Sequence, residues 1–385
     1  MQCAREVRLP WWVPKRAFNG YRRWRTERLE REHLEEFQRF YQALEDKDDI
    51  LYVFFTSNLL HWCLKTVGLV PSEVNLVLLG CDLTSEEQAW IRANVPRPFH
   101  HVRERVDDKT VWEFLFRTNQ RNFGWLDVDC MVTNPALFAE MRAIPDDAAI
   151  NCLWSYMGLG DLWILSTHFL FLNARVIAEM RRQGLPASPC TFNYEGTAFG
   201  REEGAMSGRL RKLAVSRLPT RAQVKLLEGI LPFDNRGRPA YPSLVSGYPC
   251  FDTLVMFQLT AHALGFRLNR VRELNGLYDG SPDLYFADHD FRELVHPGAV
   301  SWYRQLVDDP QARARYLMML QAERSILAPL APGLPAQYRD LLAELDAALA
   351  AEEITHQEAR EQVSSYLLSK GASPEILPRL FEAGP

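Results

Sequence analysis

Two aspartates separated by a single residue, Asp127 and Asp129, end an apolar stretch in "NFGWLDVDCM". Two ionised carboxylates in close proximity repel each other and are costly to remove from water. A divalent cation stabilises such a pair, because hard cations prefer carboxylate oxygens. On an extended backbone, residues i and i+2 point to the same side, so we expect both carboxylates to face one ligand crevice. In a second interpretation, one aspartate caps a turn or the following helix.

Alternating strands and helices surround this pair. The β-branched and aromatic runs 50–57, 75–82 and 124–129 predict strands, 99–106 predicts an edge strand, and helical patterns separate them. Thr84 and Glu87 have the spacing of a capping box at the start of one helix. This rhythm predicts an α/β fold with a mostly parallel, twisted sheet flanked by helices. Ligands bind such sheets at the carboxyl ends of the strands, where Asp127 and Asp129 lie.

The chain divides into three regions by composition. Residues 1–46 form a basic and aromatic segment followed by a charged helix, residues 47–308 form the α/β domain, and residues 309–385 form a C-terminal helical region. Residues 184–247, rich in Pro and Gly, are predicted to be an insertion. Two interpretations of residues 1–31 stay open: packing of their aromatics on the core, or peripheral contact with an anionic membrane surface.

Composition narrows the protein class. The chain has 385 residues, 47% of them hydrophobic, which suffices for a sizeable core. The formal net charge of −5 argues against nucleic acid as a partner. The seven cysteines form no CxxC pair, which indicates reduced thiols. We see no signal peptide and no membrane-spanning apolar run, so we predict a cytoplasmic protein, with membrane contact at the inner face as the alternative.

Four short segments occur in a recognisable order: "WLDVD" (125–129), "FLNARV" (171–176), "CFDTLVMFQL" (250–259) and "HPGAVSW" (296–302). This order resembles the GT-A fold, Rossmann-like glycosyltransferases that carry a DxD motif, most of all the glycogenin and bacterial galactosyltransferase (family 8-like) type. The resemblance covers roughly residues 50–302. The sequence departs from the family at Arg175, where the family has Gly, at Cys250 and Phe251 in the DQD-type segment, and at Val300 and Ser301, where the family has Lys-Pro.

The resemblance implies a metal-dependent hexosyltransferase that moves a sugar from a UDP-sugar to an acceptor hydroxyl, and it favours retention of configuration. Mn²⁺ or Mg²⁺ would be the cofactor. The implied residues are Asp127, Asp129 and His296 for the metal; Thr56, Ser57 and Asn58 for the base and ribose; Lys109, by a loose match in spacing, for the donor; and Asp252 and Asn173 beside the transferred sugar.

Simpler structural roles compete with three of these assignments. Asp252 is equally well explained as a helix N-cap. Asn173 is equally typical of a turn, and a lone histidine such as His296 is often a satisfied surface or core residue. At the level of function, a haloacid-dehalogenase-like phosphatase, a GT-A-like nucleotidyltransferase and a non-catalytic relative are the alternatives.

The acceptor is open: a small natural product, a saccharide, a lipid-linked glycan or a protein. The insertion 184–247 is basic and aromatic, so we expect it to form the acceptor side, with Arg201, Arg209 or Arg236 holding an acidic acceptor. The apolar stripes of the C-terminal helices require a partner surface, which predicts either packing within the chain or a homo-oligomer.

Overall fold

The structure is a computed structural model. It describes residues 15–104, 106, 108–132, 134–153, 155–159, 162–165, 167–185, 192–193, 221–227, 230, 250–251, 254–271, 294–295, 320, 322–351, 361 and 365. The following statements concern these residues.

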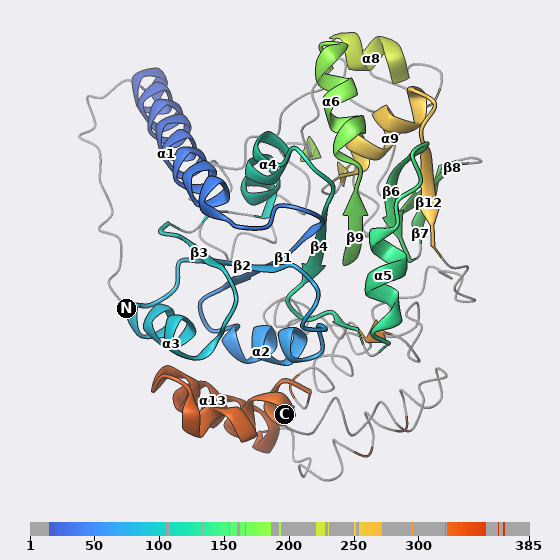
Figure 1. The fold of residues 1–385 in the computed structure, drawn as a ribbon. Coiled ribbons are helices and arrows are strands. Elements are labelled where there is room, and N and C mark those ends of the chain that lie inside the picture. Colours follow the sequence, from blue (N-terminus) through green and yellow to red (C-terminus); the bar gives the residue numbers. More distant parts are fainter. Residues whose placement is uncertain are drawn as a thin grey trace.

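A seven-stranded sheet forms the centre of the molecule, in the order β12-β6-β9-β4-β1-β2-β3 (Figure 1). The strands are β1 (Ile50–Thr56), β2 (Leu76–Cys81), β3 (Phe99–Val102), β4 (Phe123–Asp127), β6 (Ala148–Cys152), β9 (Phe169–Leu172) and β12 (Arg267–Arg270). Every neighbouring pair is parallel except those that involve β9. The predicted mostly parallel sheet is confirmed, and β3 is an edge strand as predicted.

Helices cover both faces of the sheet. They are α1 (Lys15–Ala43), α2 (Leu60–Gly68), α3 (Ser85–Asn94), α4 (Asp108–Thr118), α5 (Ala136–Arg142), α6 (Ala174–Arg182), α8 (Arg221–Leu227), α9 (Val255–Ala263) and α13 (Gln337–Ala350). Short elements complete the described chain: β5 (Met131–Val132), β7 (Ser155–Leu159), β8 (Leu162–Leu165), β10 (Phe192–Asn193), β11 (Cys250–Phe251), β13 (Leu294–Val295) and the 3-10 turn η4 (Ala331–Gly333).

Side-chain alternation along the strands creates two separate apolar cores. In β1, Leu51, Val53 and Phe55 face the core that includes α2, α5 and α13. Ile50 and Tyr52 point to the opposite core, which α1, α4, α6 and α9 cover. Because successive residues of a strand face opposite sides, a strand buried on both faces is apolar throughout, as "ILYVFF" is.

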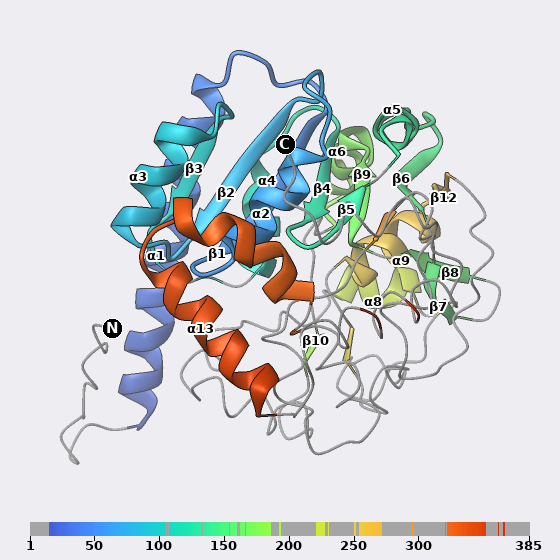
Figure 2. The same ribbon diagram turned by 90° about the horizontal axis from the view of Figure 1, so that it is seen from below.

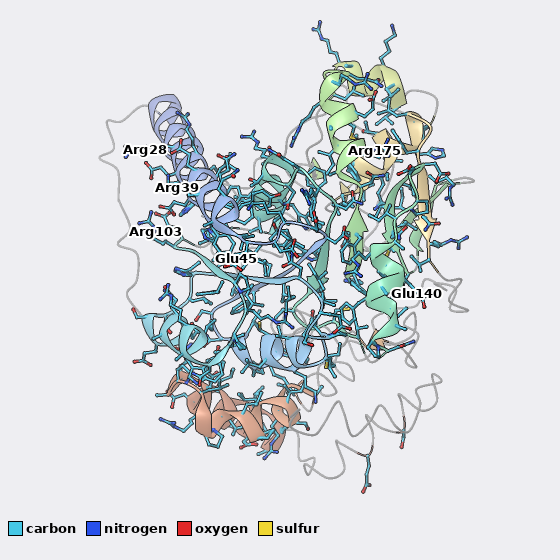
Figure 3. All side chains as sticks on the ribbon, viewed as in Figure 1. Arg28, Arg39, Glu45, Arg103, Glu140 and Arg175 are labelled. Atoms are coloured by element: carbon cyan, nitrogen blue, oxygen red, sulfur yellow. The ribbon has the colours of Figure 1, made fainter. Side chains whose placement is uncertain are left out.

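Helix α1 is longer than the sequence indicated. It begins at Lys15, directly after Pro14, whereas the charged pattern suggested a start near residue 28. Proline inside a helix breaks or kinks it, and the sequence of α1 contains none. One face of α1 is buried through Phe37 and Tyr41, while Arg28 and Arg39 lie on its charged outer side (Figure 3).

The C-terminal helices pack on the same core as the sheet. Leu327, Tyr338, Leu345 and Leu349 are buried in the cluster that contains α2 and one face of β1. Figure 2 shows α13 lying against the side of the sheet that carries α2 and α3. For α13, the partner surface of the apolar stripe belongs to this chain, whereas the helix predicted after Thr355 lies almost wholly outside the described residues. Oligomerisation stays a prediction.

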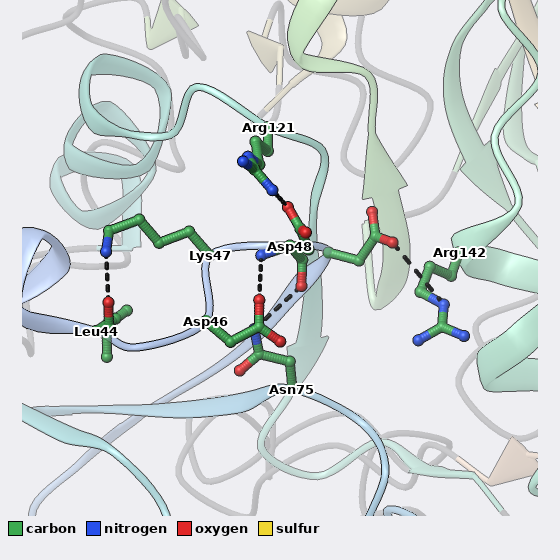
Figure 4. A network of polar contacts seen from close by, with 8 residues as sticks. Leu44, Asp46, Lys47, Asp48, Asn75, Arg121 and Arg142 are labelled. Carbon is green, nitrogen blue, oxygen red and sulfur yellow. Dashed lines mark hydrogen bonds and ion pairs between the residues drawn. The ribbon is translucent and has the colours of Figure 1, made fainter.

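A polar network secures the opposite, amino-terminal edge of the sheet, where the chain enters β1 (Figure 4). Asp48 accepts from Arg121, and its carbonyl accepts from the Asn75 amide at 3.0 Å. Arg142 lies 3.9 Å from Asp49. Exposed ion pairs of this kind contribute little free energy, so the network fixes the path of a loop at an edge where such sheets do not bind ligands.

None of the described helices is both long and apolar enough to cross a membrane. Cytoplasmic location and membrane contact through residues 1–31 stay predictions.

We expect Leu345→Ala to lower the free energy of unfolding by roughly 2–5 kcal/mol, because it opens a cavity in a core shared by α13 and the sheet. Glu344 is the matched control, since it is exposed on the same helix and its replacement by alanine should change stability by about 0.5 kcal/mol or less. Urea denaturation monitored by tryptophan fluorescence measures both. Equal stability of the two variants would contradict the packing of α13 described above.

Candidate functional site

The carboxyl ends of β1 and β4 lie side by side where the strand order changes direction. The chain runs outward through β1, β2 and β3, then crosses back to β4 on the other side of β1. Helices α2 and α3 lie on one face and α4 lies on the other. Sheets with this order bind ligands at such a switch point, outside the carboxyl ends of the strands. Strand β1 ends at Thr56 and leads into Ser57 and Asn58 at this point, and β4 ends at Asp127 and leads into Val128–Cys130.

A carboxylate from α3 holds the loop after β1. The Ser57 hydroxyl donates to Glu87 Oε2 at 2.8 Å, and the Asn58 backbone N–H donates to Glu87 Oε1 at 2.9 Å. Asn58 has a left-handed backbone (φ 69°), a conformation that asparagine tolerates better than most residues. The loop predicted to contact the nucleotide is therefore present at the predicted edge, with Asn58 exposed and Ser57 half-buried.

Glu87 is fully buried and pairs with no cation in the described part of the chain. Besides the loop, it accepts from the Thr84 backbone N–H at 2.8 Å, which completes the predicted capping box of α3. The Tyr338 hydroxyl donates to it at 2.6 Å. Burial and the Glu87 charge raise the pKa of Tyr338, which keeps its hydroxyl protonated as a donor. Four donors and the positive ends of α2 and α3 thus stabilise the carboxylate.

The aspartate pair differs from the prediction in one respect. Strand β4 ends at Asp127, and Val128 and Asp129 form a turn closed by the Cys130 N–H donating to the Asp127 carbonyl at 2.9 Å. The expectation that both side chains project from one side of an extended strand is therefore wrong. The Thr66 hydroxyl of α2 donates to the Val128 carbonyl at 2.6 Å and fixes the turn from the neighbouring element.

Protein groups contact both oxygens of the Asp127 carboxylate. The Trp125 indole N–H donates to Oδ1 at 2.6 Å, and His168 Nδ1 lies 2.9 Å from Oδ2. Trp125 is itself held by stacking on Trp112, with ring centroids 4.5 Å apart. The carboxylate is thus oriented at the strand end before any ligand arrives.

Sequence reasoning missed His168. It precedes β9, which runs antiparallel to β4, so the start of β9 meets the end of β4: the Asp127 N–H donates to the His168 carbonyl at 2.8 Å. A histidine just before an apolar strand was the available signal. To place His168 beside Asp127 from the sequence, one must know that β9 runs antiparallel to β4. The alternation of strands and helices along the chain does not indicate this.

Asp129 is buried, at 7% exposure, beside the fully buried Cys130. Burial, followed by the charges of Asp127 and Asp129, raises the pKa of the Cys130 thiol well above its ordinary value. Without a bound cation the neutral thiol is therefore favoured. The two carboxylates suit a hard divalent cation, but the described residues hold no cluster of three side chains that could complete a metal site alone. Such an ion would need ligands from a substrate or from other residues.

A short strand leads the chain toward His296. Strand β13 pairs antiparallel with β5, with Val295 opposite Met131, two residues beyond Asp129. His296 lies outside the described residues. The segment that immediately precedes it runs alongside the segment that follows the aspartate turn, as a shared site would require.

Asn173 lies near the amino-terminal end of β4, at the opposite end of that strand from the aspartate turn. Its side chain caps α6 by accepting from the Arg175 N–H at 3.0 Å and donates to the Ala148 carbonyl at 2.9 Å. The four residues of β9 separate it from His168, about 17 Å at the rise of a strand. The structure therefore assigns Asn173 the capping role and does not bring it together with the aspartates. Arg175 is also remote, paired with Asp146 at 2.8 Å (Figure 3).

Two other predicted residues are located only in part. Lys109 lies in the first turn of α4, and its side chain is outside the described atoms. Asp252 is outside the described residues. Helix α9 has Leu254 as its N-cap residue, two positions after Asp252, and both interpretations of Asp252 stay predictions.

Comparison with known proteins gives three findings. Residues 27–177 match the StrH glycosyltransferase N-terminal domain family. The chain is 28% identical over 297 residues to dTDP-dihydrostreptose--streptidine-6-phosphate dihydrostreptosyltransferase of Streptomyces griseus, a match that covers 71% of this chain and 73% of the relative. Among solved structures, the glycosyltransferase GlyE of Streptococcus pneumoniae aligns at 12% identity with a TM-score of 0.27, covering 36% of this chain and 38% of GlyE. The apo WbbM bifunctional glycosyltransferase aligns at 9% identity with a TM-score of 0.28, over 36% of this chain and 35% of that chain.

The structural similarities are too weak to support an argument about function. The sequence matches relate the chain to glycosyltransferases, and the matched range 27–177 contains both strand ends of the switch point.

Glu87→Ala should lower the free energy of unfolding by roughly 3–5 kcal/mol, since each buried donor left without an acceptor costs about 1–3 kcal/mol. Glu86→Ala removes an exposed carboxylate from the same helical turn and should cost about 1 kcal/mol or less. Thermal and urea unfolding compare the pair. Similar losses in both variants would show that Glu87 is not the buried junction described here.

Proposed function

We propose that this protein is a glycosyltransferase that moves a sugar from a pyrimidine nucleoside diphosphate sugar to a small-molecule acceptor, with a divalent cation bound at Asp127 and Asp129. The observation that carries the proposal is the switch point. Ser57 and Asn58 after β1 and the aspartate turn after β4 both lie there, within the range matched by a glycosyltransferase domain family.

The donor nucleotide is best tested as dTDP against UDP. The name of the Streptomyces griseus relative specifies a dTDP-sugar, whereas the DxD resemblance favours a UDP-hexose. Thymine and uracil present the same imide edge, and both nucleotides carry a diphosphate leaving group. We therefore propose the shared chemistry and let a donor panel choose between the two.

The electrostatics of the switch point support a requirement for a cation. In many α/β folds the helix N-terminus after the first strand binds the phosphates. Here the backbone N–H groups at the start of α2 already have acceptors: Asn58 N–H donates to Glu87, and Leu60 N–H donates to the Tyr338 hydroxyl. A diphosphate must therefore find positive charge elsewhere, and a buried carboxylate at that position would repel it.

Asp127 and Asp129 would hold the cation, with phosphate oxygens as further ligands. When bound, Mn²⁺ or Mg²⁺ would neutralise the charge that develops on the departing diphosphate. The pairing of Val295 with Met131 supports His296 as a third protein ligand. Trp125 and His168 orient Asp127. Lys109 remains proposed for donor binding and Asp252 for the sugar.

The acceptor is proposed to be a small phosphorylated molecule. The relative's name specifies streptidine-6-phosphate, and the insertion 184–247 supplies Arg201, Arg209 and Arg236, which suit an anionic group. Those arginines lie outside the described residues. Within the insertion, β10 pairs with β11, the strand directly before Asp252. Retention of configuration stays the expectation, to be read from the anomeric proton of the product by NMR.

A donor panel tests the proposal. We expect the full-length protein with Mn²⁺ to hydrolyse or transfer from dTDP- or UDP-sugars and release the nucleoside diphosphate, with activity lost in EDTA. Release of inorganic phosphate alone would instead support the phosphatase alternative, and transfer of a nucleotidyl group with release of pyrophosphate the nucleotidyltransferase. Turnover that persists in EDTA would remove the metal from the proposal.

Asp129→Asn should weaken Mn²⁺-dependent dTDP or UDP binding by about 10–100-fold, and Asp127→Asn by less. The reason is that Trp125 and His168 already engage both Asp127 oxygens, while in this motif the second aspartate usually ligates through both oxygens. His296→Ala should fall in the same 10–100-fold range. Asp146→Asn is the control, because that side chain is 90% exposed at the far edge. Calorimetry decides; an Asp129→Asn variant that binds like the wild type contradicts the assignment.

A further inference from the structure

A residue from the far end of the chain completes the loop after β1. Gln337, at the start of α13, donates through Nε2 to the Asn58 side-chain oxygen at 2.8 Å and lies 3.4 Å from the Ser57 hydroxyl. Its own side-chain oxygen accepts from the Thr84 hydroxyl at 3.2 Å. Gln337 lies outside the range matched by the StrH family, 27–177.

The neighbouring Tyr338 fixes the position of Gln337. The buried Tyr338 hydroxyl accepts from the Leu60 N–H at 3.0 Å and donates to Glu87 at 2.6 Å. Trp90 of α3 also donates to the Gly333 carbonyl just before α13, at 2.6 Å. The start of α13 is thus attached to both α2 and α3, so Gln337 has little freedom to move relative to the loop.

These contacts fix the hydrogen-bonding direction of the two loop side chains. Ser57 has one proton, and it is committed to Glu87; toward a ligand Ser57 can only accept. The Asn58 oxygen is committed to Gln337; toward a ligand its amide NH₂ donates. The loop therefore offers one acceptor beside one donor.

We propose that Gln337 is a positioning residue for the donor nucleotide, one that sets Asn58 as a donor and Ser57 as an acceptor for the imide edge of uracil or thymine. That edge carries an N–H beside a carbonyl oxygen, which complements the pair. In this arrangement the Ser57 oxygen accepts from the ring N–H and the Asn58 amide donates to the neighbouring carbonyl oxygen. Cytosine presents the reverse order, an unprotonated ring nitrogen beside an amino group, and would need the donor and the acceptor to change places. This inference rests on the proposed function and names the base class that the site selects.

Two substitutions at Gln337 separate positioning from packing. Gln337→Met keeps the length of the side chain but removes its hydrogen bonds to Asn58, Ser57 and Thr84, so Asn58 loses its fixed direction. Gln337→Glu accepts but does not donate, so the Asn58 amide must turn its NH₂ toward residue 337 and its oxygen toward the ligand. Arg339→Ala is the control, an exposed neighbour on the same helix.

The experiment is calorimetry of dTDP, UDP and CDP binding to the full chain with Mn²⁺, together with thermal unfolding. Wild type and Arg339→Ala should prefer dTDP or UDP over CDP. Gln337→Met should weaken dTDP or UDP binding by about threefold to tenfold, the worth of one hydrogen bond, and CDP binding by less, with an unchanged Tm. Gln337→Glu should reduce or reverse the preference for dTDP or UDP over CDP.

The outcomes distinguish this inference from the proposed function. If wild type binds none of the three nucleotides, both fail. If wild type binds dTDP or UDP and Gln337→Met retains its affinity and base preference, only the role of Gln337 is overturned. Equal losses for all three nucleotides accompanied by a lower Tm would show a purely structural role and would also overturn it.

Discussion

A single buried carboxylate organises one half of the candidate site. Glu87 is fully buried without a cation among the described residues, which would be prohibitive if its donors were absent. The N–H groups at the starts of α2 and α3 and the hydroxyls of Ser57 and Tyr338 satisfy it. Because these donors come from β1, α2, α3 and α13, the geometry of the strand end depends on the packing of a helix some 250 residues further along the chain.

Because of Glu87, the two halves of the switch point differ in charge and suit different parts of a ligand. The side of β1 already contains an anion, so it suits a neutral group such as a nucleobase or a ribose. The side of β4 carries two carboxylates and, as proposed, gains a cation that attracts phosphates. Under the proposed function, this charge pattern would orient a nucleoside diphosphate with its base toward Asn58 and its diphosphate toward Asp129. Neither half would impose that orientation alone.

The sequence predicted correctly those features that depend only on neighbouring residues. The capping box of Thr84 and Glu87, the apolar strands buried on two faces and the strand-end position of Asp127 follow from neighbouring residues. The contacts that finish the site depend on residues far apart in sequence. His168 reaches Asp127 only because β9 is antiparallel, and Gln337 reaches Asn58 only because α13 packs on α2. Asn173 was misplaced for the same reason, since the reversal of β9 puts the end of that strand at the other edge.

The reversal of β9 and the turn after β4 together explain how Asp127 and Asp129 tolerate each other. They are not two equivalent carboxylates on a strand. Asp127 is partly exposed and held by an indole N–H and an imidazole, so protein donors already offset part of its charge. Asp129 sits in the turn and is buried. The proposed cation would meet one carboxylate whose direction is preset and one whose burial makes neutralisation most favourable, so we expect Asp129 to be the stronger determinant of metal affinity.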